Sequence, residues 1–447
     1  MIVAGASRNI KSSDQTLHLR AGEWVFIACT IIALIWSLYY GLVVKFTLGN
    51  STLFALKTYV PEALLVIALL AGAFNGLVRG VSKTGLVLLC LLCIVFCLGV
   101  AFDNTANAAL VIRDVYIPVF FLLLMCSARL SKSAAHSFMS ALTFTMGLYV
   151  IIALVMYFIE ATNGFDWTAR FYTGYTFWGT DPVSKIAINS GGGAMRLPGP
   201  TGTSVKCALY ALAAMCVFLS NESMKGWKKL FLIVLCFACF LLYNNRSSLF
   251  GAVAILLYFG VRKLSRGKAS RFLNSILAVG IVIIGVVALA GSAGSLNFSS
   301  LYERFALWHE MFSDQMLLNL FLPTNAFSAS AGGEGIAGAS LSTVWDNSYL
   351  YFSYAFGLFA LLLLIGILCS YWARAKVAES FAKTSQASSL CRYLLLATLV
   401  VALVTNIFQG RSWFFVFVVI FGSAYASING AADSFRADVV DSVKHMR

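Results

Sequence analysis

The fold is decided by the stretch "KKLFLIVLCFACFLLYNNRSSLFGAVAILLYFGVRK", which runs from Lys228 to Lys263. Two apolar runs flank one polar turn that contains Arg246, and basic residues mark both outer ends. Lysine and arginine gather on the cytoplasmic side of membrane helices. The stretch therefore predicts a hairpin that crosses the membrane out and back, with Asn244 and Asn245 making the reversal.

The hairpin is short for a bilayer. The expected arms, 229–245 and 247–262, are about 25 Å long at 1.5 Å per residue, whereas the hydrocarbon core is about 30 Å thick. We therefore expect Arg246 to lie just below the outer headgroups, where the phosphates of a lipid diphosphate would lie.

The whole chain has the composition of a membrane protein. Of its 447 residues, 60% are hydrophobic and 11% are charged, and the mean hydropathy is +0.85. Soluble domains carry about 25% charged residues. We expect an all-α, polytopic protein that forms one transmembrane domain over 1–447. About twelve runs approach the length of about 20 residues that a spanning helix needs: 24–44, 61–78, 85–102, 108–126, 138–160, 204–220, 229–245, 247–262, 273–291, 348–372, 393–408 and 412–427.

Charge sets the expected orientation. With the N-terminus inside, 22 lysines and arginines fall on the inner side and 10 on the outer side, so both termini are expected in the cytoplasm. The same distribution accounts for the net charge of +14 without a nucleic-acid partner. Two long outer loops follow, about 161–203 and 292–347, and loops of that length are usually functional or disordered. The second loop includes the amphipathic pattern "LYERFALWHEMF".

The outer side carries arginines that the positive-inside rule does not explain. Arginine grips phosphate oxygens at two points, so a membrane-anchored phosphate or diphosphate is the expected ligand. Aromatic side chains such as Trp178 suit sugar rings, and carboxylates suit proton transfer from a hydroxyl. The candidates are Arg113, Arg196, Arg246, Arg304, Glu310, Asp346 and Trp178. No metal site or cofactor is expected.

Each candidate also has a plainer interpretation. An interfacial arginine can reach lipid phosphate, and Trp178 can be an interface anchor. Arg113 and Asp114 can form a local ion pair. Asp346 can be the N-cap of the next helix.

Four short motifs bring a family resemblance: "RLPGP" at 196–200, "NNRSS" at 244–248, "ERFALWHEMF" at 303–312 and "DNSYLYFSYAFGLFALLLL" from Asp346. In their order and shared outer face, these motifs resemble those of the O-antigen polymerase (Wzy) and O-antigen ligase superfamily of bacterial inner-membrane enzymes. The resemblance covers about 190–370. Ligases typically carry a His before the Asn that stands here at Asn347, and this chain has Asp346, which favours the polymerase branch.

The resemblance implies an inverting, metal-independent glycosyltransferase with a GT-C-like membrane fold in the inner membrane. Its donor is a glycan on undecaprenyl diphosphate at the periplasmic face, and a chain-length regulator is a candidate partner. The polymerase extends the glycan on a new lipid-linked repeat unit. By position, Arg196, Arg246 and Arg304 are assigned to the diphosphate, with Arg113, Trp178, Asn347 and Tyr349 as further substrate contacts. Asp346 is the first candidate base and Glu310 the second.

Two rival functions remain open. A ligase would transfer the glycan to lipid A core. A transporter or flippase would place charges and broken helices near the membrane midplane, whereas the charges here gather at the outer face.

Overall fold

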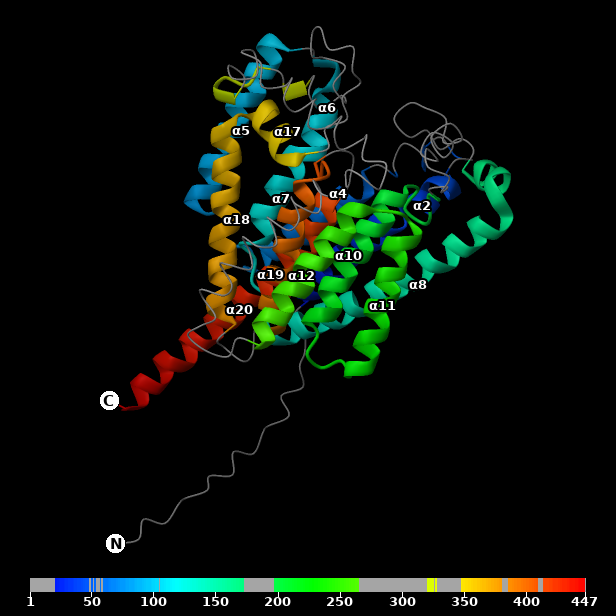
Figure 1. Ribbon diagram of the computed structural model, residues 1–447. Helices are drawn as coiled ribbons and strands as arrows, with labels where there is room; N and C mark the ends of the chain where they lie inside the picture. Colours follow the sequence, from blue (N-terminus) through cyan, green and yellow to red (C-terminus); the bar gives the residue numbers. More distant parts are fainter. Residues whose placement is uncertain are drawn as a thin grey trace.

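The protein is an all-helical bundle in a computed structural model (Figure 1). The structure describes residues 21–47, 50, 52–53, 57, 59–103, 105–172, 197–264, 320–324, 326–327, 347–379, 385–408 and 413–446. No described residue belongs to a strand, and one isolated bridge joins Val78 and Ala128. The expected amphipathic helix at 301–312 and the span at 273–291 lie outside the described residues.

The helices follow the apolar runs of the sequence, with boundaries that differ by a few residues. They are α1 (Ala21–Leu38), α2 (Tyr40–Thr47), α4 (Val60–Phe74), α5 (Lys83–Phe102), α6 (Ala108–Val111), α7 (Ile117–Met125), α8 (Lys132–Phe171), α10 (Ser204–Ser220), α11 (Gly226–Leu242), α12 (Arg246–Leu264), α17 (Ser348–Phe356), α18 (Leu358–Ala378), α19 (Ser385–Ala402) and α20 (Trp413–Met446). A π-helical turn, Ile112–Tyr116, joins α6 to α7.

The protein is embedded in a membrane. Within the described residues, six segments are long and apolar enough to span one, judged by length and composition: Ala21–Leu38, Lys83–Phe102, Ala108–Met125, Lys132–Gly164, Leu358–Ala378 and Trp413–Asp433. Val60–Phe74, Ser204–Ser220 and Gln386–Ala402 are shorter apolar helices. The all-α membrane fold is thus confirmed, while the full set of twelve spans stays a prediction.

Helix α10 forms the centre of the bundle. All its residues except Val205 and Lys206 are buried, and it packs against α8, α11, α12, α19 and α20. Small residues let membrane helices approach closely, and α10 carries Ala208, Ala211, Ala213 and Ala214. Both arms of the predicted hairpin, α11 and α12, pack on α10.

Interactions between helix ends define two opposite ends of the bundle. At one end, which we call the Arg79 end, Arg79 and Arg129 both pair with Asp433, and Glu379 pairs with Arg262 and Arg392. Helix α20 extends away from the bundle at this end in Figure 1. The assignment of this end to the cytoplasm stays a prediction from the charge pattern.

At the opposite end, which we call the Arg246 end, Arg246 begins α12, and contacts join chain segments that are remote in sequence. The backbone N–H of Phe327 donates to Asp103 over 2.8 Å, and that of Leu42 donates to the carbonyl of Pro200 over 3.3 Å.

Two helical segments differ from the bounds that the sequence predicts. The expected span 348–372 is divided by Gly357, whose φ of 87° and ψ of 155° interrupt the helix between α17 and α18. Helix α8 continues past the expected end at 160 to Phe171, with a non-helical Gly164 at φ 78° and ψ −175°. The first eleven residues of the expected loop 161–203 are therefore part of this kinked helix.

Candidate functional site

The turn before Arg246 is built by the two asparagines that precede it. Asn244 adopts a left-handed φ of 47°, a conformation that asparagine tolerates better than most residues. The Oδ1 of Asn245 accepts hydrogen bonds from the backbone N–H of Ser248 at 2.8 Å and from its hydroxyl at 2.9 Å, which caps the start of α12. The predicted reversal at these two residues is confirmed, and it leaves the side chain of Arg246 exposed.

The segment 403–408, between α19 and α20, joins the starts of two helices. The hydroxyls of Ser247 and Thr405 share a hydrogen bond. Ser348 Oγ donates to the carbonyl of Thr405 at 2.7 Å and accepts from the N–H of Ile407 at 2.9 Å. The N-termini of α12 and α17 therefore meet at this segment, and we call the group Arg246, Ser247, Asn347, Ser348 and Thr405 the helix-start junction.

Asn347 caps α17. Its Oδ1 accepts from the N–H groups of Tyr349 at 2.9 Å and Leu350 at 3.1 Å. The capping role considered for Asp346 therefore belongs to Asn347. The hydroxyl of Tyr349 donates to the carbonyl of Leu399 in α19 over 2.9 Å, so this candidate substrate contact is bonded inside the bundle.

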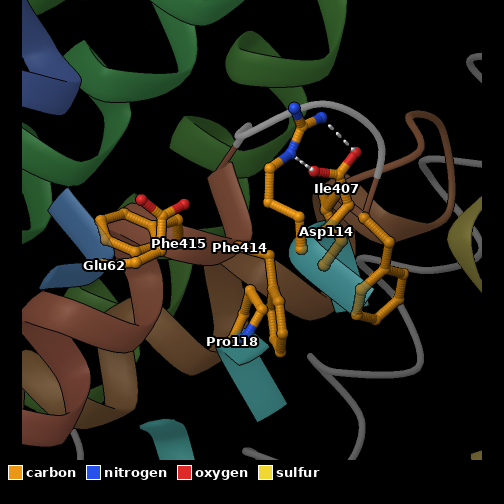
Figure 2. A pocket seen from close by; sticks show the side chains of 8 residues that line it. Glu62, Asp114, Pro118, Ile407, Phe414 and Phe415 are labelled. Carbon is orange, nitrogen blue, oxygen red and sulfur yellow. Dashed lines mark hydrogen bonds and ion pairs between the residues drawn. The ribbon is translucent and has the colours of Figure 1, made fainter. Parts of the chain in front are cut away.

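Arg113 and Asp114 form the predicted ion pair within the π-helical turn. The Nε of Arg113 lies 2.7 Å from Oδ1 of Asp114 and its Nη2 lies 3.1 Å from Oδ2, a two-point geometry drawn as dashed lines in Figure 2. The side chains are 23% and 14% exposed. π-Helical turns often occur at functional sites, and ionisable residues within a span are a functional signal in their own right.

A small pocket connects this ion pair to the segment 403–408. Figure 2 shows Glu62, Pro118 and the aromatic side chains of α20 around it. Its volume is about 10 Å³, close to the minimum that holds one water molecule. The lining residues are Glu62, Arg113, Asp114, Pro118, Ile407, Phe408, Phe414 and Phe415. Because Ile407 also bonds to Ser348, the pocket and the helix-start junction share one backbone segment.

Electrostatics at this end favour an anion. Helix N-termini carry partial positive charge, and two of them meet at the junction together with the full charge of Arg246. A cation at the start of a helix is unfavourable for the helix itself. The two helix N-termini and Arg246 therefore favour an anion at this junction, and the adjacent pocket also carries the carboxyl groups of Glu62 and Asp114.

Three predicted site residues thus flank the segment 403–408: Arg113, Arg246 and Asn347. Arg196, Arg304, Glu310, Asp346 and Trp178 lie outside the described residues. Within the part of the chain that is described, no group of three or more His, Cys, Asp or Glu side chains is placed to hold a metal ion.

Among the described buried acids that the sequence interpretation missed, Glu160 in α8 is the most completely buried. Its side chain is fully buried. Its two carboxyl oxygens each lie 3.1 Å from the N–H of Gly199, and Oε1 lies 2.9 Å from the hydroxyl of Tyr172. The available signal was a single carboxylate at the end of an apolar run, "LVMYFIE", because such residues are rare in spans.

Comparisons with known proteins add no assignment, since neither a protein-family model nor a curated protein sequence matches the chain.

Proposed function

We propose that this protein is a polytopic glycosyltransferase that polymerises oligosaccharide repeat units linked to undecaprenyl diphosphate. In this proposal the chain has about twelve spans in a GT-C-like arrangement, and the Arg246 end faces the periplasm of the bacterial inner membrane. The growing glycan moves from its lipid diphosphate to a sugar hydroxyl of the next lipid-linked unit, with inversion at the transferred sugar. No metal ion or cofactor takes part in the proposed transfer.

The helix-start junction carries the proposal. Arg246 and two helix N-termini concentrate positive charge around 403–408, and Arg113 lies beside the same segment. The departing diphosphate gains negative charge as the glycosidic bond breaks, and preorganised cationic donors stabilise such charge. Arg196 and Arg304 are proposed to complete the phosphate contacts, with Asp346 or Glu310 as the base.

The test is replacement of Arg246 by Ala and by Lys in a strain whose surface polysaccharide depends on this protein. Loss of one preorganised donor typically lowers the catalytic rate by about 10²- to 10³-fold, so polymer ladders on a gel should shorten or vanish. Lys keeps the charge without the two-point grip and should restore the ladder only in part. Arg170→Ala is the matched control, because Arg170 is also exposed on the outer part of α8.

Deletion of the gene separates the rival functions. A single repeat unit on the lipid A core indicates a polymerase, and full-length polymer retained on undecaprenyl lipid indicates a ligase. Repeat units held on the cytoplasmic leaflet indicate a flippase. Wild-type ladders from both Arg246→Ala and Arg113→Ala, with normal protein levels, would contradict the proposed role of this site.

A further inference from the structure

The contacts of Glu160 link three groups. They are the Glu160 carboxyl, the Tyr172 hydroxyl and the backbone of Gly199, and both side chains are almost completely buried, with 0% and 1% of their surface exposed. The kink of α8 at Gly164 lies between Glu160 and Tyr172. The group therefore joins α8 before its kink, and Tyr172 directly after the end of α8, to the turn that precedes α10.

The Tyr172 hydroxyl lies within hydrogen-bonding distance of two oxygens, and two separate hydrogen bonds there take two protons. Tyr172 Oη lies 2.7 Å from the carbonyl oxygen of Gly199 and 2.9 Å from Oε1 of Glu160. Each pair is at hydrogen-bonding distance, and two full-strength bonds, rather than one hydroxyl proton shared between two acceptors, take one proton in each pair. Tyr172 supplies one proton, and an ionised carboxylate supplies none. A protonated Glu160 supplies the second: its O–H donates to Tyr172, Tyr172 donates to the Gly199 carbonyl, and the Gly199 N–H donates to the other carboxyl oxygen.

Among the described residues, none of the ion pairs involves Glu160, and Lys45 of α2 lies over the ring of Phe171, 5.3 Å from its centre. Tyr243 from α11 and Cys207 from α10 reach the same turn, where a Cβ on Gly199 would lie 2.5 Å from Tyr243 Oη and 2.6 Å from Cys207 Sγ. Tyr243 donates to the carbonyl of Ala153 at 2.7 Å, and Cys207 lies 3.1 Å from the hydroxyl of Thr201. The groups that meet at this turn, like Tyr172, are neutral near pH 7. A buried carboxylate without a cation or enough donors is strongly unfavourable.

We infer that Glu160 is held as a neutral carboxylic acid, and that its proton fastens the turn 197–202 to α8. Glu160 is then a positioning residue, because it acts through the turn rather than on a reacting atom. Arg196, the proposed phosphate-binding arginine, immediately precedes this turn in the sequence, so loss of the hydrogen bonds that hold the turn is expected to lower transfer. Only this last consequence rests on the proposed function.

Hydrogen exchange at the Gly199 amide tests whether Glu160 holds the turn 197–202 to α8. Pro198 and Pro200 have no amide hydrogen, so Gly199 supplies the one exchangeable amide of the segment 198–200. Glutamine mimics the protonated acid, since its N–H₂ donates to Tyr172 and its carbonyl accepts from Gly199. Glu160→Gln should therefore keep the slow exchange of Gly199. Glu160→Ala and Tyr172→Phe should each speed it about tenfold or more, because each removes a buried hydrogen bond. Asn163→Ala, an exposed change whose amide bonds only to its own helix at Ile159, is the control.

Infrared spectroscopy shows whether the carboxyl group of Glu160 is protonated. The wild-type minus Glu160→Gln difference spectrum should contain the carbonyl stretch of a protonated carboxylic acid. A carboxylate band in its place would overturn the inference. The inference would also fail if the Gly199 amide exchanged as fast in a folded Glu160→Gln protein as in Glu160→Ala. If Glu160→Ala does not fold, Tyr172→Phe replaces it in the same comparison, because it also lacks the hydrogen bond between residues 160 and 172.

The pH dependence of transfer tests the link to function. Wild-type transfer should decline at high pH as Glu160 ionises, and the Glu160→Gln enzyme should keep its rate there. If no transfer activity exists, the exchange and infrared results still decide the inference, so its failure and the failure of the proposed function are distinguishable.

Discussion

Ser247 and Thr405 share a hydrogen bond between their hydroxyls although 158 positions separate them in the chain. The bond holds the start of α12 against the segment that joins α19 to α20. Ser348 holds the start of α17 to the same segment. The position of Arg246 is therefore set by three parts of the chain rather than by its own hairpin alone.

We expect this link to show as a coupling in a double-mutant cycle. Ser247→Ala and Thr405→Val should each lower the free energy of unfolding by about 0.5–1.5 kcal/mol, and the double variant should lose less than the sum. Thermal unfolding of the detergent-solubilised protein measures all three. Strictly additive losses would show that the two hydroxyls do not interact.

Replacing one partner of the Arg113–Asp114 ion pair should lower the stability of the protein more than replacing both. Arg113→Leu or Asp114→Leu leaves a partly buried charge without its counterion, at an expected cost of about 1.5–3 kcal/mol. The double replacement by Leu removes both charges and should restore part of that stability. Unfolding midpoints check the order, and activity of the double variant should stay low if Arg113 contacts the diphosphate.

Asn347 allows capping to be separated from substrate contact. Asn347→Ala should lower stability by about 1 kcal/mol, whereas Asp at this position caps a helix about as well as Asn. Asn347→Asp lacks the amide donors, however, so it should be stable and poorly active if the side chain also binds sugar. Equal activity of Asn347→Asp and wild type would limit Asn347 to the cap.

Gly199 should tolerate no side chain. Its φ is 59°, and a Cβ would lie 2.5 Å from Tyr243 Oη, so Gly199→Ala should cost about 2–4 kcal/mol. Gly366→Ala in α18 is the matched control, because a Cβ there meets nothing within 4 Å and Ala favours a helix by about 1 kcal/mol over Gly. Protein yield and the unfolding midpoint distinguish the two variants.

Local patterns in the sequence predicted most of the helical elements that are described. The expected span 204–220 coincides with α10, and the reversal at Asn244 and Asn245 occurs where the apolar runs stop. These features depend on hydrophobic length and on residues with strong conformational preferences. The break at Gly357 was not predicted, because one glycine within an apolar run is compatible with a continuous helix.

Contacts between distant segments could not be predicted. The bond of Ser247 to Thr405 and the group around Glu160 depend on which helices become neighbours, and a single sequence does not encode that in any local period. Glu160 also stood at the very end of an expected span, where an acidic residue resembles the first residue of a loop. The structure identifies it by burial and by its contacts with Gly199 and Tyr172.

The enclosure of α10 has a consequence for biosynthesis. Helices are made in chain order, and two of the neighbours that cover α10, namely α19 and α20, are made last. Until they insert, the face of α10 that packs against α19 and α20 lacks these two neighbours. Assembly of the bundle is therefore completed by its final segment, and a nascent chain that terminates before Ser385 presents an uncovered central helix to the quality-control proteases of the membrane.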